Sequence, residues 1–225
     1  MAELIISLDI TEEEKMDEVI EKTENYINWY KVGPVPFLKF GFNLIENLKT
    51  LNKKVFFDFK FFDIPNTVKG SVENCCKLGI DMVSLHILGG ERMVKEAIEI
   101  RNKVNKNTKI VGITVLTSFS GEEFGVPDVK KMVSALAESG FKWGLDGIVC
   151  SGQELSFLRK YPFYLIVPGI RIEKVKDDQK RVITPSNAVK MGADFLVVGR
   201  PVYESKNPEN AVKKLIKEMK NGKMD

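Results

Sequence analysis

The stretch KVFFDFKFFDIPNTVKGSVENCCKLGIDMVSLH, residues 54–86, holds one strand–helix–strand unit, and repetition of this unit decides the fold. Its aromatic and β-branched ends, 54–59 and 82–86, predict two strands. The segment 67–78 between them has helical length and predicts a helix that connects the two strands. Alternation of this kind indicates an α/β protein built on a parallel sheet.

The same alternation continues in both directions, and eight strand–helix pairs can be counted. The other strands are expected at 4–10, 29–32, 110–115, 147–150, 164–167 and 195–198. The longer stretches between them predict helices, among them 44–51, 91–105, 129–139 and 208–219. Because no Pro-rich or Ser-rich linker interrupts the 225 residues, the pattern predicts one (β/α)8 TIM barrel, a single domain over residues 1–225. An open doubly wound sheet is less favoured, since no turn carries GxGxxG or GxxxxGK[ST].

Composition excludes several classes of protein. Lys and Arg number 34 against 31 Asp and Glu, a net charge of +3, so no nucleic-acid partner is expected. No apolar run approaches the roughly 18 residues that span a bilayer, so no membrane partner is expected either. The three cysteines and the absence of a basic leader before the first apolar run argue against a secreted, disulfide-built protein and predict a cytoplasmic one. No cluster of His, Cys and carboxylates has the spacing of a metal site.

Polar residues gather where the predicted strands end. Barrels of this type carry their chemistry at the carboxyl ends of the strands. The candidates at these ends are Asp9, Lys31, Asp58, Lys60, Asp63, His86, Thr117, Ser118, Ser151, Arg171, Gly199 and Arg200. These side chains are therefore expected around one cavity.

Asp58 and Lys60 form the most informative pair. Two positions apart in one strand, they point to the same side, and with Phe57 and Phe59 facing the helices that side is the barrel interior. Charges there are costly unless they are paired or serve a ligand. A lysine between Asp58 and Asp63 stays protonated, which suits a proton donor better than a Schiff-base nucleophile. The alternative is a buried ion pair that only fixes the strand register.

The segment VVGR, 197–200, indicates a phosphate site. The loops after strands seven and eight of such barrels grip phosphate with backbone N–H groups, and Gly199 and Arg200 offer close approach and a bidentate charge. The charged stretch 168–181 is either a mobile lid or an exposed loop.

Other distinctive residues suggest packing. His86, the only histidine, is either an acid or base or a satisfied core imidazole. The aromatic residues Phe56, Phe57, Phe61 and Phe62 are expected to pack toward the helices.

The motifs SLDI (7–10), DFKFFDIPNT (58–67), PGIR (168–171), DDQKRV (177–182) and VVGR resemble the orotidine 5′-phosphate decarboxylase family, in the same order over nearly the whole chain. The string D-x-K-x-x-D-I-P-N-T is highly specific. Ketogulonate phosphate decarboxylases and hexulose phosphate synthases share D-x-K-x-x-D but are not expected to continue with I-P-N-T. Departures from the family pattern, HILGG at 86–90 and phenylalanines in place of leucines around Lys60, fall on packing positions.

The resemblance implies a role for each matching residue. Lys31, Asp58, Lys60 and Asp63 would form a charged catalytic array, and Lys31 is preferred over Lys39 because its spacing from Asp58 fits the family without a gap. The substrate-binding residues would be Asp9 and Lys31 at the ribose, Thr117 and Ser118 at the base, and Arg171, Gln179, Gly199 and Arg200 at the phosphate, which Tyr203 would support. Asp63 and Thr67 would cross a homodimer interface to the neighbouring site.

The implied reaction is loss of CO2 from orotidine 5′-phosphate to give uridine 5′-phosphate, without a cofactor. Two alternatives remain open. One is a Mg2+-dependent sugar-phosphate decarboxylase or aldolase of the same superfamily. The other is a catalytically silent barrel that binds a phosphorylated ligand.

Overall fold

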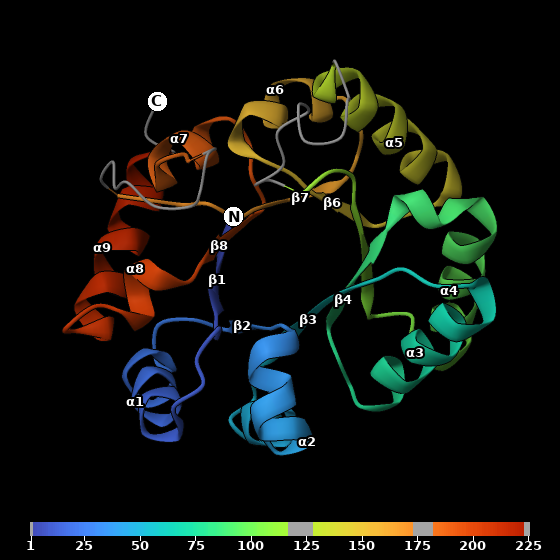
Figure 1. Ribbon diagram of the computed structural model, residues 1–225. Helices are drawn as coiled ribbons and strands as arrows, with labels where there is room; N and C mark the ends of the chain where they lie inside the picture. Colours follow the sequence, from blue (N-terminus) through green and yellow to red (C-terminus); the bar gives the residue numbers. More distant parts are fainter. Residues whose placement is uncertain (1, 117–127, 173–181, 223–225) are drawn as a thin grey trace.

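The computed structural model describes residues 2–116, 128–172 and 182–222, which form a closed barrel of eight parallel strands in chain order (Figure 1). The strands are β1 Glu3–Ser7, β2 Trp29–Val32, β3 Lys54–Phe61, β4 Met82–His86, β5 Lys109–Ile113, β6 Gly147–Val149, β7 Tyr164–Val167 and β8 Phe195–Val198. β1 pairs with both β2 and β8, which closes the sheet. The predicted (β/α)8 barrel is confirmed.

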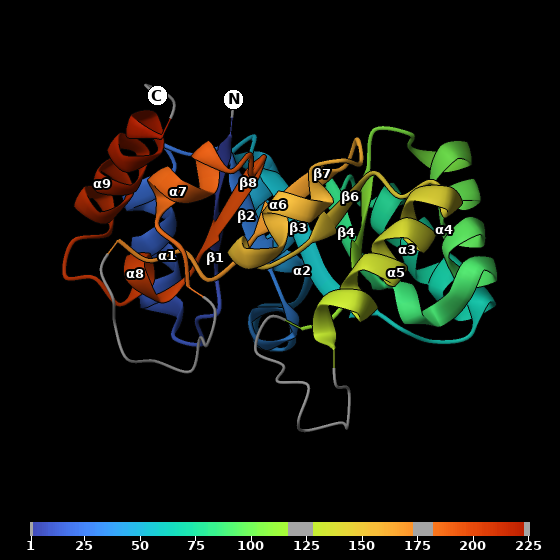
Figure 2. The ribbon, with the colours of Figure 1, turned by 90° about the horizontal axis from the view of Figure 1, so that it is seen from above.

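Helices surround the barrel on all sides, and strands lie inclined between them (Figures 1 and 2). They are α1 Glu13–Thr23, α2 Pro34–Thr50, α3 Pro65–Lys77, α4 Gly90–Val104, α5 Val129–Trp143, α6 Leu155–Leu158, α7 Pro185–Lys190, α8 Arg200–Tyr203 and α9 Pro208–Asn221, with short 3₁₀ turns η1 Ile87–Gly89 and η3 Gly152–Glu154. α9, the last helix, packs beside α1, the first. None of the helices in the described part of the chain is both long and apolar enough to cross a bilayer.

Two helices begin earlier than expected, and proline is the reason. α2 begins at Pro34 rather than near residue 44, and α3 begins at Pro65 rather than at Thr67. Proline suits the first turn of a helix because its fixed φ is already helical and its missing N–H would have no partner there. Gly41, with φ 63° and ψ −149°, then kinks α2. The first part of α2 consequently begins after the single residue that follows β2, the strand that carries Lys31.

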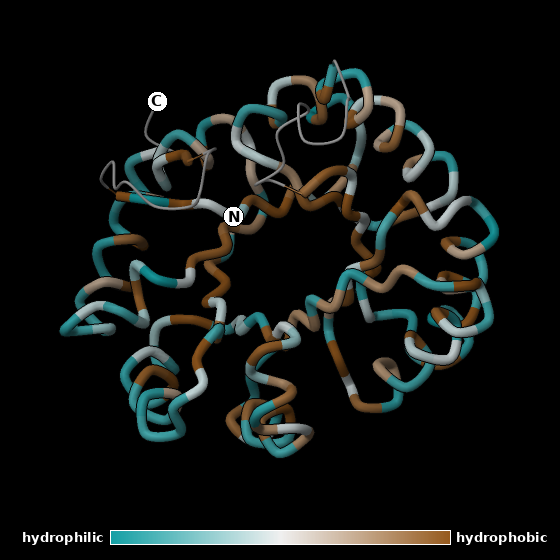
Figure 3. Tube along the Cα trace, viewed as in Figure 1, coloured by the Kyte–Doolittle hydropathy of each residue, from teal (hydrophilic) through white to brown (hydrophobic). Residues whose placement is uncertain are grey.

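The apolar core has two layers, as the alternation of side chains in strands requires. The inner layer fills the barrel and consists of Ile5, Trp29, Phe56, Met82, Val111, Ile166, Phe195 and Val197. The larger outer layer lies between the strands and the helices. Figure 3 shows hydrophobic residues along the strands and more hydrophilic ones toward the outer surface of the helices.

The four aromatic residues expected to face the helices divide into two groups. Phe57 and Phe61 do pack in the outer layer. Phe56 instead lies inside the barrel, because it shares the strand parity of Asp58, and Phe62 is 62% exposed. The expectation was therefore wrong for Phe56 and Phe62.

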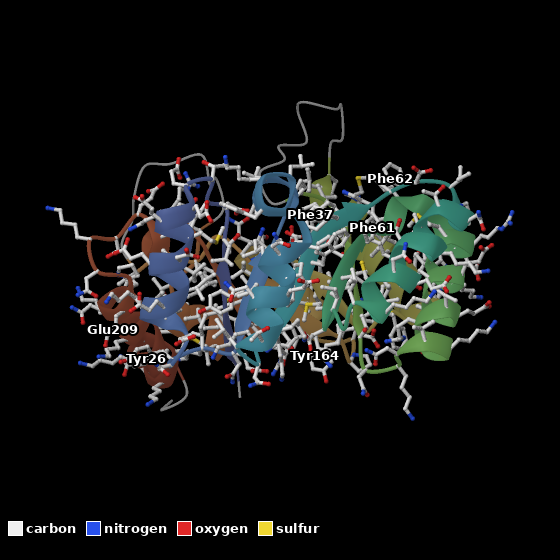
Figure 4. The ribbon with its side chains drawn as sticks, turned by 90° about the horizontal axis from the view of Figure 1, so that it is seen from below. Tyr26, Phe37, Phe61, Phe62, Tyr164 and Glu209 are labelled. Carbon is white, nitrogen blue, oxygen red and sulfur yellow. The ribbon has the colours of Figure 1, made fainter. Side chains whose placement is uncertain are left out.

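A phenylalanine cluster fixes α2 on β3. The rings of Phe57 and Phe59 stack with centroids 4.0 Å apart, and Phe37 of α2 meets both edge-on at 5.2 and 5.3 Å. Edge-to-face and offset-stacked pairs of this kind stabilise beyond the burial of their area. Figure 4 shows Phe37 and Phe61 toward the same end of the barrel. The cluster supports the wall from which Asp58 and Lys60 project.

Aspartates secure the opposite, amino-terminal end of the barrel. The pattern Gly-x-Asp precedes three strands, at 79–81, 144–146 and 192–194, and each glycine has positive φ. Each carboxylate accepts a hydrogen bond from the backbone of the preceding strand: Asp81 from Val55 N (2.8 Å), Asp146 from Ile110 N (2.7 Å) and Asp194 from Leu165 N (2.9 Å). These bonds tie successive strands together.

Candidate active site

A cavity of about 290 Å³ opens at the carboxyl ends of the strands. Its polar lining comes from Ser7, Asp9, Lys31, Asp58, Lys60, Arg171, Gly199, Arg200 and Tyr203. Phe56, Ile113, Val149 and Val197 form an apolar floor and wall. The structure thus brings together most of the residues singled out in the sequence.

Asp58 lies at the centre of the charged array. Its Oδ2 atom is 2.9 Å from Lys60 Nζ and 3.4 Å from Lys31 Nζ, and Lys31 Nζ is 3.5 Å from Asp9 Oδ1. Two ammonium groups and two carboxylates therefore alternate along the cavity wall. Because Asp58 is only 7% exposed, its charge depends on these partners rather than on water.

The electrostatic balance keeps Asp58 ionised. Burial raises the pKa of the carboxyl group, but the positive charges of Lys31 and Lys60 and the hydrogen bonds from Lys60 and Ser84 outweigh burial, so the pKa is lowered overall. The site consequently presents a fixed negative charge 2.9 Å from the Lys60 Nζ atom. This is the arrangement that a lysine proton donor requires.

Lys60 occupies an unusual backbone conformation. Its φ of 50° lies in the left-handed region, which a residue with a Cβ seldom adopts. The pairing of β3 with β4 shifts at this point, from Phe57 opposite Val83 to Phe61 opposite Leu85. Strain of this kind persists only where the surroundings enforce it, and it concentrates at functional sites.

Two serines outside the set of predicted site residues contact the array. Ser7 Oγ donates a 2.6 Å hydrogen bond to Asp9 Oδ2, and Ser84 Oγ donates a 2.8 Å hydrogen bond to Asp58 Oδ1. Both are buried and both sit in strands on the interior-facing parity. The sequence could have identified both serines from this parity. Ser7 is two residues before Asp9 and Ser84 is two residues before His86, so each points to the same side of its strand as a candidate site residue.

The arginines gather at the other side of the cavity, next to α8. Gly199 precedes α8, and a Cβ there would come within 3.2 Å of the Tyr203 ring and 3.5 Å of Ser7 Cβ. A side chain at this position would therefore crowd the Tyr203 ring in the cavity wall. Arg171 is buried, and together with Arg200 it makes this side of the cavity suitable for an anion.

The remaining predicted residues are not part of the cavity that one chain forms. Asp63 and Thr67 are exposed, in the loop after β3 and the first turn of α3, and neither is among the described residues that line the cavity. Thr117, Ser118 and Gln179 lie outside the described residues, as does most of the segment 168–181.

His86 does not fit one of its two expected roles, that of a satisfied core imidazole. It lies at the end of β4 with its ring centroid 5.6 Å from that of Phe62, outside the cavity lining defined by the described residues. Burial, and then the charge of Lys60, lower its pKa, so the imidazole is neutral near pH 7. Its Nδ1 atom is buried without a hydrogen-bond partner among the described residues, so it is not a satisfied core imidazole.

The fold and the site together define a class: a (β/α)8 barrel whose cavity holds arginines and a lysine–carboxylate array, an arrangement suited to an anionic ligand. Among the described residues, no group of three or more His, Cys, Asp or Glu side chains could hold a metal ion.

Comparison with known proteins identifies the family. The profile of the orotidine 5′-phosphate decarboxylase / HUMPS family matches residues 2–215, and the chain belongs to this family. The orotidine 5′-phosphate decarboxylase of Lawsonia intracellularis is 45% identical, with 96% of this chain and 98% of that protein covered. The enzyme of the same name from Maridesulfovibrio salexigens is 41% identical, with 97% and 99% covered.

Solved structures agree. The crystal structure of orotidine 5′-phosphate decarboxylase from Lactobacillus acidophilus superposes with a TM-score of 0.84 at 29% identity, covering 97% of this chain and 99% of that one. The orotidine 5′-monophosphate decarboxylase of Methanocaldococcus jannaschii, complexed with the inhibitor BMP, gives 0.82 at 25% identity over 97% of this chain and 99% of that one.

Proposed function

We propose that this chain decarboxylates orotidine 5′-phosphate to uridine 5′-phosphate, a step of pyrimidine nucleotide synthesis, without a cofactor. The observation that carries the proposal is the contact of 2.9 Å between Lys60 Nζ and Asp58 Oδ2, inside a cavity whose opposite side holds Gly199 and Arg200. Relatives of 45% and 41% identity bear the name of this enzyme. An anion site and a proton-donating lysine are what the substrate and the reaction need.

Substrate binding is assigned from the two sides of the cavity. Arg171, Gly199 and Arg200 would hold the phosphate, and Gln179 would join them. Asp9 and Lys31 would bind the ribose hydroxyls. The pyrimidine would then reach the array, where Thr117 and Ser118 would contact its polar edge; the cavity-lining residue Leu116 directly precedes them.

The chemistry follows from the array. Asp58 would face the carboxylate of the substrate, and this repulsion disappears as the group leaves as neutral CO2. The bond between C6 and the carboxyl carbon breaks, and its electron pair stays on C6. Lys60 stabilises that developing negative charge and then transfers a proton from Nζ to C6. Solvent afterwards reprotonates Lys60.

Binding energy from the phosphate can contribute to this step. In the proposed binding mode the arginine side of the cavity would lie away from the reacting carbon, so its interactions would be available for orienting the substrate and excluding water. A drier cavity strengthens the attraction between Lys60 and the developing charge.

We further infer that the chain works as a homodimer in which Asp63 and Thr67 complete the neighbouring site. Both are exposed in the segment that follows β3, and large exposed apolar side chains occur on the segments that follow β2 and β3. Leu38 is 83% exposed, Phe62 62% and Ile64 67%. An apolar surface of this kind is typical of protein–protein contact.

Subunit mixing tests the shared site. Lys60→Ala and Asp63→Ala subunits would each be inactive alone, but a hybrid dimer would contain one site with both residues intact. Random exchange would therefore restore about a quarter of wild-type activity. No recovery between dimers shown to exchange would contradict the shared site, and a monomer at micromolar concentration would contradict the dimer.

A Mg2+-dependent reaction on a sugar phosphate is the second candidate, because the matching family includes HUMPS members. The I-P-N-T continuation at 64–67 favours the nucleotide substrate. A silent barrel is disfavoured, because a binding protein gains nothing from the buried, costly charge of Asp58. One catalytic domain over residues 1–225 and a cytoplasmic location remain predictions.

An ultraviolet assay of orotidine 5′-phosphate loss, with and without a chelator, tests the function. Turnover that a chelator leaves unchanged, and that Lys60→Ala removes, is the expected result. Absence of turnover in the folded wild-type protein, or turnover that depends on Mg2+, would contradict the proposal.

A further inference from the structure

We propose that Ser84 is a positioning residue for this reaction: its hydroxyl group holds both the Asp58 carboxylate and the backbone that carries Lys60. This rests on the proposed function. Ser84 Oγ donates to Asp58 Oδ1 at 2.8 Å and accepts from the backbone N of Lys60 at 2.9 Å. Ser84 is fully buried and is not among the described residues that line the cavity, so it acts through the array and not on the substrate.

The register of β3 and β4 explains why a side chain is needed here. Between the pairs Phe57–Val83 and Phe61–Leu85, the segment 58–60 of β3 faces the single residue Ser84 of β4. Extra residues at such an irregularity lose their ladder hydrogen bonds. The Lys60 N–H, turned aside by its φ of 50°, donates to the Ser84 hydroxyl instead of to a strand carbonyl. The side chain thus replaces the missing backbone partner.

The polarity of these bonds is fixed. A backbone N–H can only donate, so the hydroxyl oxygen accepts from Lys60 and its one proton remains for Asp58. Asp58 then has a partner on each oxygen, with Ser84 at Oδ1 and the two lysines at Oδ2. The carboxylate cannot rotate without breaking a contact on both sides. One hydroxyl group therefore fixes the acid and the lysine relative to each other.

Loss of this hydroxyl should affect catalysis more than binding. Ser84→Ala would leave the Asp58 Oδ1 atom and the Lys60 N–H group without their hydrogen-bond partner. The hydroxyl group that fixes Asp58 and Lys60 relative to each other would then be missing. A displacement of an ångström in such an array costs on the order of a hundredfold in rate. Because the phosphate and ribose contacts lie elsewhere, the affinity for the ligand should hardly change.

The experiment compares Ser84→Ala, Ser84→Thr and Thr108→Val with the wild type. Thr108 is the matched control, since it is also fully buried and donates to a backbone carbonyl, Ile80 O at 2.7 Å, but at the other end of the barrel. Ser84→Thr keeps the hydroxyl. The assays are kcat and KM for orotidine 5′-phosphate, affinity for uridine 5′-phosphate, thermal unfolding, and the titration of the Asp58 carboxyl carbon by NMR, assigned with Asp58→Asn.

We expect Ser84→Ala to lower kcat at least tenfold with KM and product affinity within threefold, and Ser84→Thr to keep kcat within threefold. The pKa of Asp58 should rise in Ser84→Ala and stay unchanged in Thr108→Val. A wild-type kcat in Ser84→Ala, or a loss confined to KM or shared with Thr108→Val in proportion to unfolding, would overturn the proposal. Absence of wild-type turnover would contradict the proposed function instead, and the Asp58 titration would still decide whether Ser84 holds the carboxylate.

Discussion

The two ends of the barrel use aspartate in opposite ways. At the carboxyl end, Asp58 is buried between two lysines beside a cavity, on a strand distorted at Lys60. At the amino end, Asp146 accepts from a backbone N–H and from the Arg101 guanidinium, both at about the ideal distance, 2.7 and 2.8 Å. Figure 4 shows the two ends at the top and bottom of the view, with Phe37, Phe61 and Phe62 toward the carboxyl end and Tyr26, Tyr164 and Glu209 toward the amino end.

The difference separates function from stability. The amino end is filled by aromatic rings, with Trp29 edge-on to Phe195 at 5.3 Å and Phe195 against Tyr164 at 5.9 Å. The carboxyl end leaves a cavity and keeps its charges available to a ligand. Substitutions at the carboxyl end should therefore impair activity and leave stability unchanged. Substitutions at the amino end should lower stability and leave activity unchanged.

Lys60→Ala should give the largest effect. Removing the proton donor and the positive charge at C6 should lower kcat by at least about 10³-fold. The midpoint of thermal unfolding should move by only a few degrees, and uridine 5′-phosphate should still bind. The assay is turnover at saturating substrate. A variant that loses activity only because it unfolds would break the comparison between the two ends.

Asp146→Ala tests the amino end. The change leaves the buried Arg101 guanidinium without its carboxylate and the Ile110 N–H without its acceptor. We expect a loss of about 3 kcal/mol in the free energy of unfolding, measured by urea titration. The kcat of the folded fraction should equal that of the wild type. A tenfold fall in kcat would show that the ends are not separable in this way.

Arg200→Ala divides the carboxyl end itself into a binding side and a reacting side. Loss of a charged phosphate contact should weaken uridine 5′-phosphate binding by about 30-fold, or about 2 kcal/mol. Uridine, which lacks the phosphate, is the matched ligand, and its affinity should stay the same. Calorimetry measures both. Equal weakening of the two ligands would indicate that Arg200 supports the cavity rather than the phosphate.

The smallest effect concerns pH and His86. Burial, and then the charge of Lys60, lower the pKa of His86 in the folded state below its ordinary value of 6.5, so the unfolded chain binds the proton first as the pH falls. Stability from this group is thus fully present above pH 6.5 and is lost as the pH falls toward the folded-state pKa. Because the chain has one histidine, His86→Gln should flatten the dependence of the unfolding midpoint on pH between neutral and mildly acidic conditions. An unchanged slope would contradict the assignment.

Strand periodicity in the sequence predicted the barrel and much of its charged site. The alternation of apolar runs and helical stretches gave the eight-stranded barrel, and the parity of Asp58 and Lys60 placed both in its interior. The same parity should have placed Phe56 there as well, since it precedes Asp58 by two residues. The Gly-x-Asp pattern occurs before three strands and could have been recognised in the sequence, although no repeat of greater length accompanies it.

The rest depends on tertiary structure. Ser84 matters only because β3 is irregular at Lys60, and alternation along a strand does not predict a left-handed residue within it. α2 begins early because of Pro34 and is kinked at Gly41. A proline and a glycine this close together predict a loop when only the local sequence is considered. Asp63 and Thr67 cannot be placed by one chain, since their proposed partners belong to a second subunit.

Aminoethylation of a Lys60→Cys variant tests whether Lys60 is the proton donor. The three native cysteines are buried, and burial raises the pKa of Cys75 to about 12, so the new thiol is the reactive one. We expect almost no turnover of orotidine 5′-phosphate before modification and clear recovery once the cysteine carries an aminoethyl group, which rebuilds a lysine-like amine. Substantial turnover before modification, or none after it in a protein that still binds uridine 5′-phosphate, would contradict the account.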